Sequence, residues 1–104
     1  MWNPPIALST AEQKIAARTQ KARKFFVFLR TIRHELLDAD FQQTLAQSYS
    51  PAPGGKAPVE AGVLALATLL QAYCHVSDQD AVELTVMDKR WQMVLDCLGA
   101  EQPP

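Results

Sequence analysis

Residues 50–73, SPAPGGKAPVEAGVLALATLLQAY, join a cluster of helix breakers to a nearly continuous apolar run. Three prolines and two glycines between residues 51 and 58 disfavour regular structure. Pro58 suits the first position of a helix, where its missing N–H costs nothing. After it only Glu60, Thr68 and Gln71 are clearly polar before Cys74. A helix that is apolar nearly all round is buried either in protein or in a membrane.

The length of the apolar run favours burial in protein. Residues 61–70 are far fewer than the roughly 20 that a bilayer requires. We therefore expect no membrane association and predict the central helix of a small bundle. The side chains expected to be buried are Val59, Val63, Leu64, Leu66, Leu69, Leu70 and Tyr73.

The segment before it predicts a long basic helix from about residue 10 to residue 37. Ser9 and Glu12 have the spacing of a capping box. The second half repeats large apolar residues at helical spacing, which predicts a face packed on the core. The first half offers little apolar surface and reads as a basic arm. The predicted apolar stripe consists of Phe25, Leu29, Ile32 and Leu36, widened by Phe26 and Leu37.

Two further segments predict helices. Asp38 can cap a short helix that carries Phe41, Leu45 and Tyr49 at steps of four. Ser77 and Asp80 form a second N-cap pattern, and Gly99 suits the position that closes a helix. Between them an apolar stripe predicts one helix, or two with a break at residues 88–90: Leu84, Met87, Trp91, Val94 and Leu98. The sequence thus predicts an all-α bundle of four to five helices.

The length of 104 residues suits a single domain. We expect a flexible N-terminal tail at residues 1–9, one helical domain at residues 10–99, and a C-terminal tail or the start of a linker at residues 100–104. Two cysteines are too few for a disulfide framework, and no signal peptide pattern opens the chain. A cytoplasmic location is the expectation that follows.

The net charge of −1 conceals an uneven distribution. Residues 1–37 carry seven bases against two acids, a balance of +5, and the rest carries three bases against nine acids, a balance of −6. Such asymmetry suggests contact with a nucleic acid or a membrane by one end. The candidate phosphate-binding residues are Lys14, Arg18, Lys21, Arg23, Lys24, Arg30 and Arg33. On an isolated helix these residues fall on two sides, so an ordinary solvated face is the alternative.

Residues 34–99 resemble the N-terminal domain of bacterial insertion-sequence transposases of the InsH type. The shared pattern is a Gly-basic-x-Pro entry, a leucine-rich helix ending in tyrosine, a Ser-Asp-x-acid-Ala-Val-Glu helix start, and an Arg-Trp ending closed by Leu and Gly. The matching residues are Gly55, Lys56, Pro58, Tyr73, Ser77, Asp78, Asp80, Ala81, Val82, Glu83, Arg90, Trp91, Leu98 and Gly99. Lys56, Ala61 and Gln79 depart from the residues usual in that family.

The resemblance implies a non-catalytic domain that contacts DNA, at the terminal inverted repeats, during transposition. In that family a separate catalytic domain carries an acidic triad with two metal ions. The sequence shows no such triad, so we expect no enzymatic activity and no cofactor. The expected partners are DNA and either a second copy or the catalytic domain. The alternatives are a helical protein-interaction or oligomerisation module without DNA binding, and a truncated transposase remnant.

Other chemical readings are weaker. The pair of helices around YCHVSDQDAV (residues 73–82) has the outline of a helix-turn-helix. Its second helix would present acids that repel phosphate, which favours a packing role: Asp78, Asp80, Glu83 and Asp88. Cys74, His75, Cys97 and His34 lack the spacing of a zinc site. We therefore expect no metal site and no cysteine nucleophile.

Overall fold

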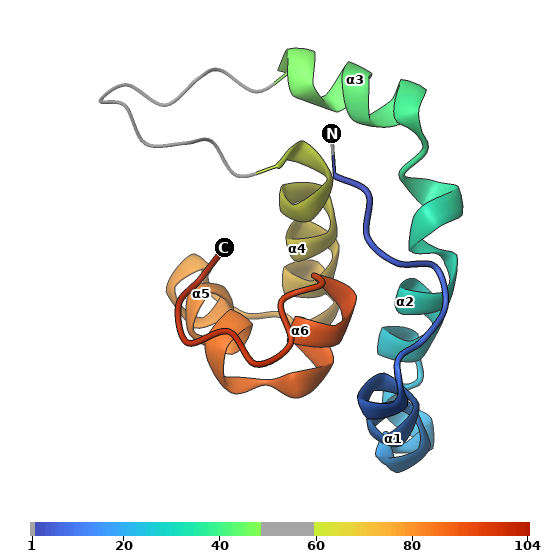
Figure 1. Ribbon diagram of the computed structural model, residues 1–104. Coiled ribbons are helices and arrows are strands. Elements are labelled where there is room, and N and C mark those ends of the chain that lie inside the picture. Colours follow the sequence, from blue (N-terminus) through green and yellow to red (C-terminus); the bar gives the residue numbers. More distant parts are fainter. Residues whose placement is uncertain (1, 49–59) are drawn as a thin grey trace.

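The computed structural model describes residues 2–48 and 60–104, and all regular structure in these ranges is helical (Figure 1). They form six α-helices and one short 3₁₀ helix, where the sequence predicted four to five helices. The helices are α1 (Thr10–Arg18), η1 (Lys21–Arg23), α2 (Phe25–Leu36), α3 (Ala39–Ser48), α4 (Ala61–Cys74), α5 (Asp78–Met87) and α6 (Lys89–Val94). Within the described ranges, no helix combines the length and hydropathy that crossing a bilayer demands.

The prediction of one long first helix is wrong, because the chain bends between α1 and α2. The capping box at Ser9 and Glu12 is confirmed. Thr19, however, takes an extended conformation, its hydroxyl donates to the carbonyl of Ile15, and Gln20 is also extended. Threonine can satisfy a helix terminus through its own hydroxyl, which favours ending a helix there. Lys24 then donates to the carbonyl of Ala16 and covers the end of α1.

The buried face of α2 differs from the predicted apolar stripe. Phe26 and Leu29 are buried, but the next positions on that face are Arg30 and Arg33, both at most 1% exposed. Leu36 is 42% exposed. The apolar pattern therefore misplaced the stripe, because it assumed that both arginines face solvent.

The centre of the core is α6 rather than α4. Trp91, Met93 and Val94 are each at most 1% exposed, and α6 packs against α2, α4 and α5. In α4 Leu66 and Leu70 are fully buried, as predicted, but Leu69 is 45% exposed. The predictions at Tyr49, Pro58 and Val59 lie outside the described residues.

A break separates α5 from α6, which decides between one helix and two. Asp88 has an extended conformation, ends α5, and accepts from the backbone N–H groups of Arg90 and Trp91 at the start of α6. The N-cap at Ser77 is confirmed. The chain leaves α6 through Asp96, at φ 55°, and Gly99, at φ 84°, closes the following turn rather than the helix itself.

Residues 2–9, predicted as a flexible tail, run beside α2 and are held by side chains of the domain (Figure 1). Arg30 donates to the carbonyls of Ile6 and Ala7, and Arg33 donates to that of Pro5. Gln42 exchanges two hydrogen bonds with the Trp2 backbone. The segment is therefore part of the packed domain.

Arg33 also joins α2 to the end of α6. Its guanidinium donates to the carbonyls of Met93 and Val94 at 3.0 and 2.9 Å. These groups belong to the last turn of α6, where carbonyls lack helical partners and carry partial negative charge. Burial, together with the neighbouring positive charge of Arg30, lowers the pKa of Arg33 to about 10. Arg33 is thus a buried cation held mainly by backbone carbonyls.

We expect Arg33→Met to lower the free energy of unfolding by about 3 kcal/mol, because three carbonyl groups lose a buried donor. Chemical denaturation measures the change. Arg18→Met, at an exposed position on α1, is the control and should stay within about 0.5 kcal/mol of the wild type. Equal stability of the wild type and Arg33→Met would show that the carbonyls find other partners.

We expect Glu12→Gln to lower the free energy of unfolding by about 3 kcal/mol, because fully buried Arg30 loses its carboxylate partner. Burial alone would raise the pKa of Glu12, but hydrogen bonds from Arg30 and Ser9 outweigh it and hold the pKa below the ordinary 4.5. A lowered carboxyl pKa stabilises the fold above the pKa of the unfolded chain. This contribution is lost as the pH falls through the folded-state pKa.

The difference in stability between the wild type and Glu12→Gln should therefore shrink below about pH 4.5. Denaturation curves across that range, with exposed Glu83→Gln as the control, measure it. A difference that stays constant throughout the acid range contradicts this account.

Candidate nucleic-acid interface

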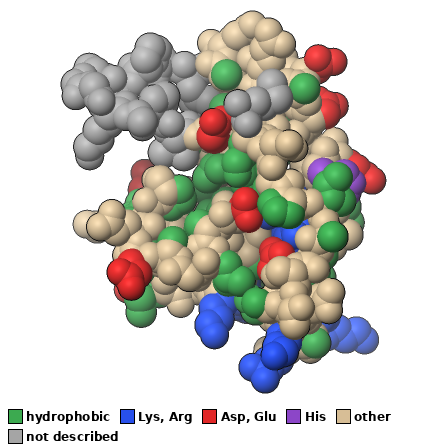
Figure 2. All heavy atoms as spheres, in the orientation of Figure 1, with side chains coloured by type: hydrophobic (Ala, Val, Ile, Leu, Met, Phe, Trp, Pro, Cys, Tyr) green, Lys and Arg blue, Asp and Glu red, His purple; other side chains and the backbone are tan. Residues whose placement is uncertain are grey.

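A groove of about 680 Å³ lies between α1 and the start of α6 and carries basic side chains on both walls. We call it the basic groove. No Asp or Glu is among its lining residues. They are Ala11, Lys14, Ile15, Arg18, Thr19, Gln20, Arg23, Lys89, Arg90, Gln92, Leu98 and Gly99. Figure 2 shows Lys and Arg side chains gathered at the lower end of the molecule, where α1 lies, while most acids on this face lie above them.

The first wall is α1. Lys14 and Arg18 are one helical turn apart, so both project from the same side of the helix. The position of α1 is fixed by α2, because the Glu12 carboxylate accepts hydrogen bonds from Arg30 of α2 at 2.6 and 3.1 Å. Glu12 is 8% exposed and its charge is balanced by that contact. The only acid on α1 therefore adds little negative potential to the groove.

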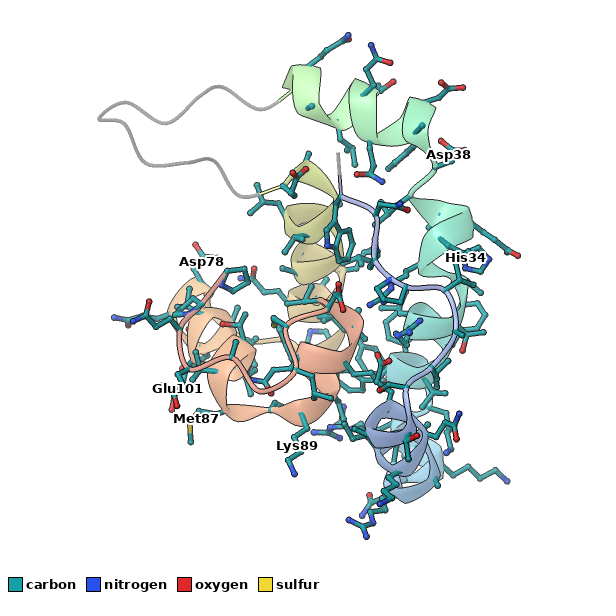
Figure 3. The ribbon with its side chains drawn as sticks, in the orientation of Figure 1. His34, Asp38, Asp78, Met87, Lys89 and Glu101 are labelled. Carbon is teal, nitrogen blue, oxygen red and sulfur yellow. The ribbon has the colours of Figure 1, made fainter. Side chains whose placement is uncertain are left out.

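The second wall is the junction of α5 and α6. Lys89 is exposed there, and Figure 3 shows it projecting toward the end of the molecule that holds α1. Arg90 is bound to Asp88 through two hydrogen bonds at 3.2 and 2.9 Å, and its guanidinium lies 4.8 Å from the ring centre of Phe26. Arg90 is therefore an internally paired cation, whereas Lys89 is not.

The ion pair at Asp88 determines the charge of both partners. Burial would raise the pKa of Asp88, but hydrogen bonds from the Arg90 side chain and backbone outweigh it and lower the pKa below 3.8. The hydrogen bonds that the Arg90 guanidinium donates to Asp88 in turn raise the pKa of Arg90. Both groups stay charged at neutral pH, and their charges cancel beside the groove.

Gln92 holds the turn that borders the groove. Its side chain, 5% exposed, donates to the carbonyls of Val86 and Ala100 and accepts from the N–H of Gly99. These bonds fix residues 97–100 against α6. Leu98 and Gly99 of this turn line the groove.

The structure divides the seven predicted phosphate-binding residues into three groups. Lys14, Arg18 and Arg23 line the basic groove. Lys21 and Lys24 are exposed beyond its lining. For Arg30 and Arg33 the prediction needs correction, because both side chains are buried and do not reach the surface. Their guanidinium groups donate to Glu12 and to backbone carbonyls.

Sequence reasoning missed Lys89, because the residue falls in the half of the chain with a balance of −6. Only the fold brings it opposite α1, more than 70 positions earlier in the sequence. The sequence did contain an indication of this site, since Lys89 and Arg90 are adjacent basic residues at the predicted break between two helices. That pattern alone does not show which helix lies opposite.

Three of the residues that carry the transposase resemblance have structural roles. Ser77 caps α5, Trp91 is 1% exposed in the core, and Arg90 pairs with Asp88. Asp78 and Asp80 are exposed on the first turn of α5. The matching residues Gly55, Lys56 and Pro58 lie outside the described residues.

No family model, curated protein or solved structure matches the chain. Function must therefore be inferred from the basic groove and from the sequence pattern.

Two observations in residues 2–48 and 60–104 concern the metal and cysteine chemistry considered from the sequence. No group of three or more His, Cys, Asp and Glu side chains there could hold a metal ion. Burial raises the pKa of the Cys97 thiol, which is the opposite of what an activated nucleophile needs. Tyr73 packs on Phe25 and Phe26, and its hydroxyl donates to the carbonyl of Ala22.

We expect Asp88→Asn to strengthen the binding of polyanions. Asparagine also caps helices well, so α6 should remain, while Arg90 is released from its ion pair. The variant should elute from a cation-exchange resin at higher salt than the wild type. Asp80→Asn, with the same change in net charge at an exposed position on α5, should shift elution less. Equal shifts would show that Asp88 has no special effect on the groove.

Proposed function

We propose that this chain is a non-catalytic domain that contacts DNA through the basic groove. The observation that carries the proposal is the convergence of Lys14, Arg18, Arg23 and Lys89 on one groove without a lining carboxylate. Neutralising phosphates releases counterions, which drives binding in a salt-dependent manner. The nearby acids Glu12 and Asp88 are paired with Arg30 and Arg90 and do not oppose this attraction.

The sequence resemblance gives this activity a setting. If the chain acts as its likeness to transposase N-terminal domains implies, the DNA is the terminal inverted repeat and the chemistry belongs to another domain. The acidic first turn of α5, with Asp78 and Asp80, argues against α5 as a recognition helix. The groove is the better DNA contact, because α1 and the start of α6 place basic side chains on both of its walls.

The alternative function is a protein-interaction or oligomerisation module. It is favoured by apolar side chains exposed on α4 and α5: Leu69 is 45%, Val82 53% and Met87 71% exposed. None of these three residues lines the basic groove. The two functions therefore predict different sensitive residues.

Arg18→Glu tests the DNA function. At about 50 mM salt, each phosphate contact contributes roughly tenfold to affinity, so charge reversal should weaken binding by at least about tenfold. Fluorescence anisotropy with a labelled duplex that carries the DNA flanking the gene measures it. A Gln43→Glu and Gln79→Glu double variant makes the same change in net charge at exposed positions of α3 and α5.

This control should bind nearly as well as the wild type. If both variants lose affinity equally, binding follows net charge and not the groove. If the wild type binds no DNA at low salt, the DNA function is wrong. An effect of Val82→Asp on the oligomeric state would then support the interaction module.

A further inference from the structure

The number of cations free to meet phosphate in the basic groove is small. Arg90 is paired with Asp88, whereas Lys14, Arg18, Arg23 and Lys89 have no carboxylate partner among the described residues. Arg23 lies 5.8 Å from the ring centre of Tyr73, a contact that leaves its charge uncompensated. Four free cations therefore face the groove.

These cations stand on both sides of the groove. Lys14 and Arg18 belong to α1, and Lys89 belongs to the start of α6 on the opposite wall. Between them the lining contains the apolar side chains of Ile15 and Leu98. A linear anion lying along the groove would be contacted from two sides, which suits one backbone strand and not two.

The groove offers no side chain that stacks on a base and few uncharged groups that could read one. No aromatic side chain lines it, although proteins that bind single strands rely on aromatic platforms for stacking. The amide of Gln92 is used by three internal hydrogen bonds, and the hydroxyl of Thr19 donates to Ile15. Of the uncharged polar side chains, only Gln20 is left to reach a base edge.

We propose that the basic groove holds the sugar–phosphate backbone of one strand of duplex DNA through about four phosphates and reads no base. This rests on the proposed function and specifies its ligand. Duplex DNA keeps its bases stacked inside and presents the backbone as a ridge. Binding a duplex therefore requires no aromatic side chains for base stacking. Phosphate contacts position a protein without carrying sequence information.

The salt dependence of binding measures the number of contacts. For B-DNA, log K falls with log salt at a slope of about −0.9 for each neutralised phosphate, so four contacts give about −3.6. We would measure this slope by fluorescence anisotropy with the full chain and two labelled duplexes of unrelated sequence and equal length. A single strand of the same length completes the set.

Matched variants locate the contacts. Lys14→Ala with Lys89→Ala removes one cation from each wall and should make the slope shallower by about 1.8. Lys21→Ala with Lys24→Ala removes the same charge outside the groove lining and should leave the slope unchanged. Circular dichroism confirms that both variants fold.

The expected result is a wild-type slope near −3.6, equal affinity for both duplexes, and weaker binding of the single strand. Tighter binding of the single strand, a strong preference for one duplex, or a slope changed only by the Lys21 and Lys24 variant would overturn the inference while leaving DNA binding intact. Absence of binding to every probe at low salt removes the proposed function itself.

Discussion

The fold depends on two buried arginines at neighbouring positions of one helix face. Arg30 and Arg33 point into the domain from α2, at 0% and 1% exposed. Burying an ionised group is costly unless it is paired and hydrogen-bonded. The structure supplies a carboxylate to Arg30 through Glu12, and backbone carbonyls to both guanidiniums. Segments that are distant in sequence are thereby held together.

The partners of these arginines determine the arrangement of the domain. Arg30 joins α2 to α1 and to residues 6 and 7, while Arg33 joins α2 to Pro5 and to the end of α6. Arg33 also lies 5.6 Å from the ring centre of Trp2. Because each guanidinium can donate several hydrogen bonds in a fixed plane, one side chain can fix two segments at once.

Internal pairing also determines which charges are available at the surface. Glu12 on α1 and Asp88 at the start of α6 belong to the two elements that form the basic groove, and each is bound to an arginine. The groove therefore carries positive charge although the whole chain carries −1. Asp38 and Asp78, which pair with no arginine among the described residues, lie away from the end of the molecule that holds α1 (Figure 3). This separation is what a domain that approaches a polyanion with one end requires.

The sequence by itself determined the helical class, the caps at Ser9 and Ser77, and the burial of Leu66, Leu70 and Trp91. These features depend on residues close together in the chain, where helical periodicity and local hydrogen bonds leave few choices. Only the tertiary structure decided that α1 ends at Arg18, that Arg30 and Arg33 are buried, and that Lys89 lies opposite α1. The spacing of an arginine in a helical sequence is the same whether its side chain faces solvent or a buried carboxylate, so the sequence pattern does not reveal its burial. Its role is set by Glu12 and by carbonyls up to 61 positions away.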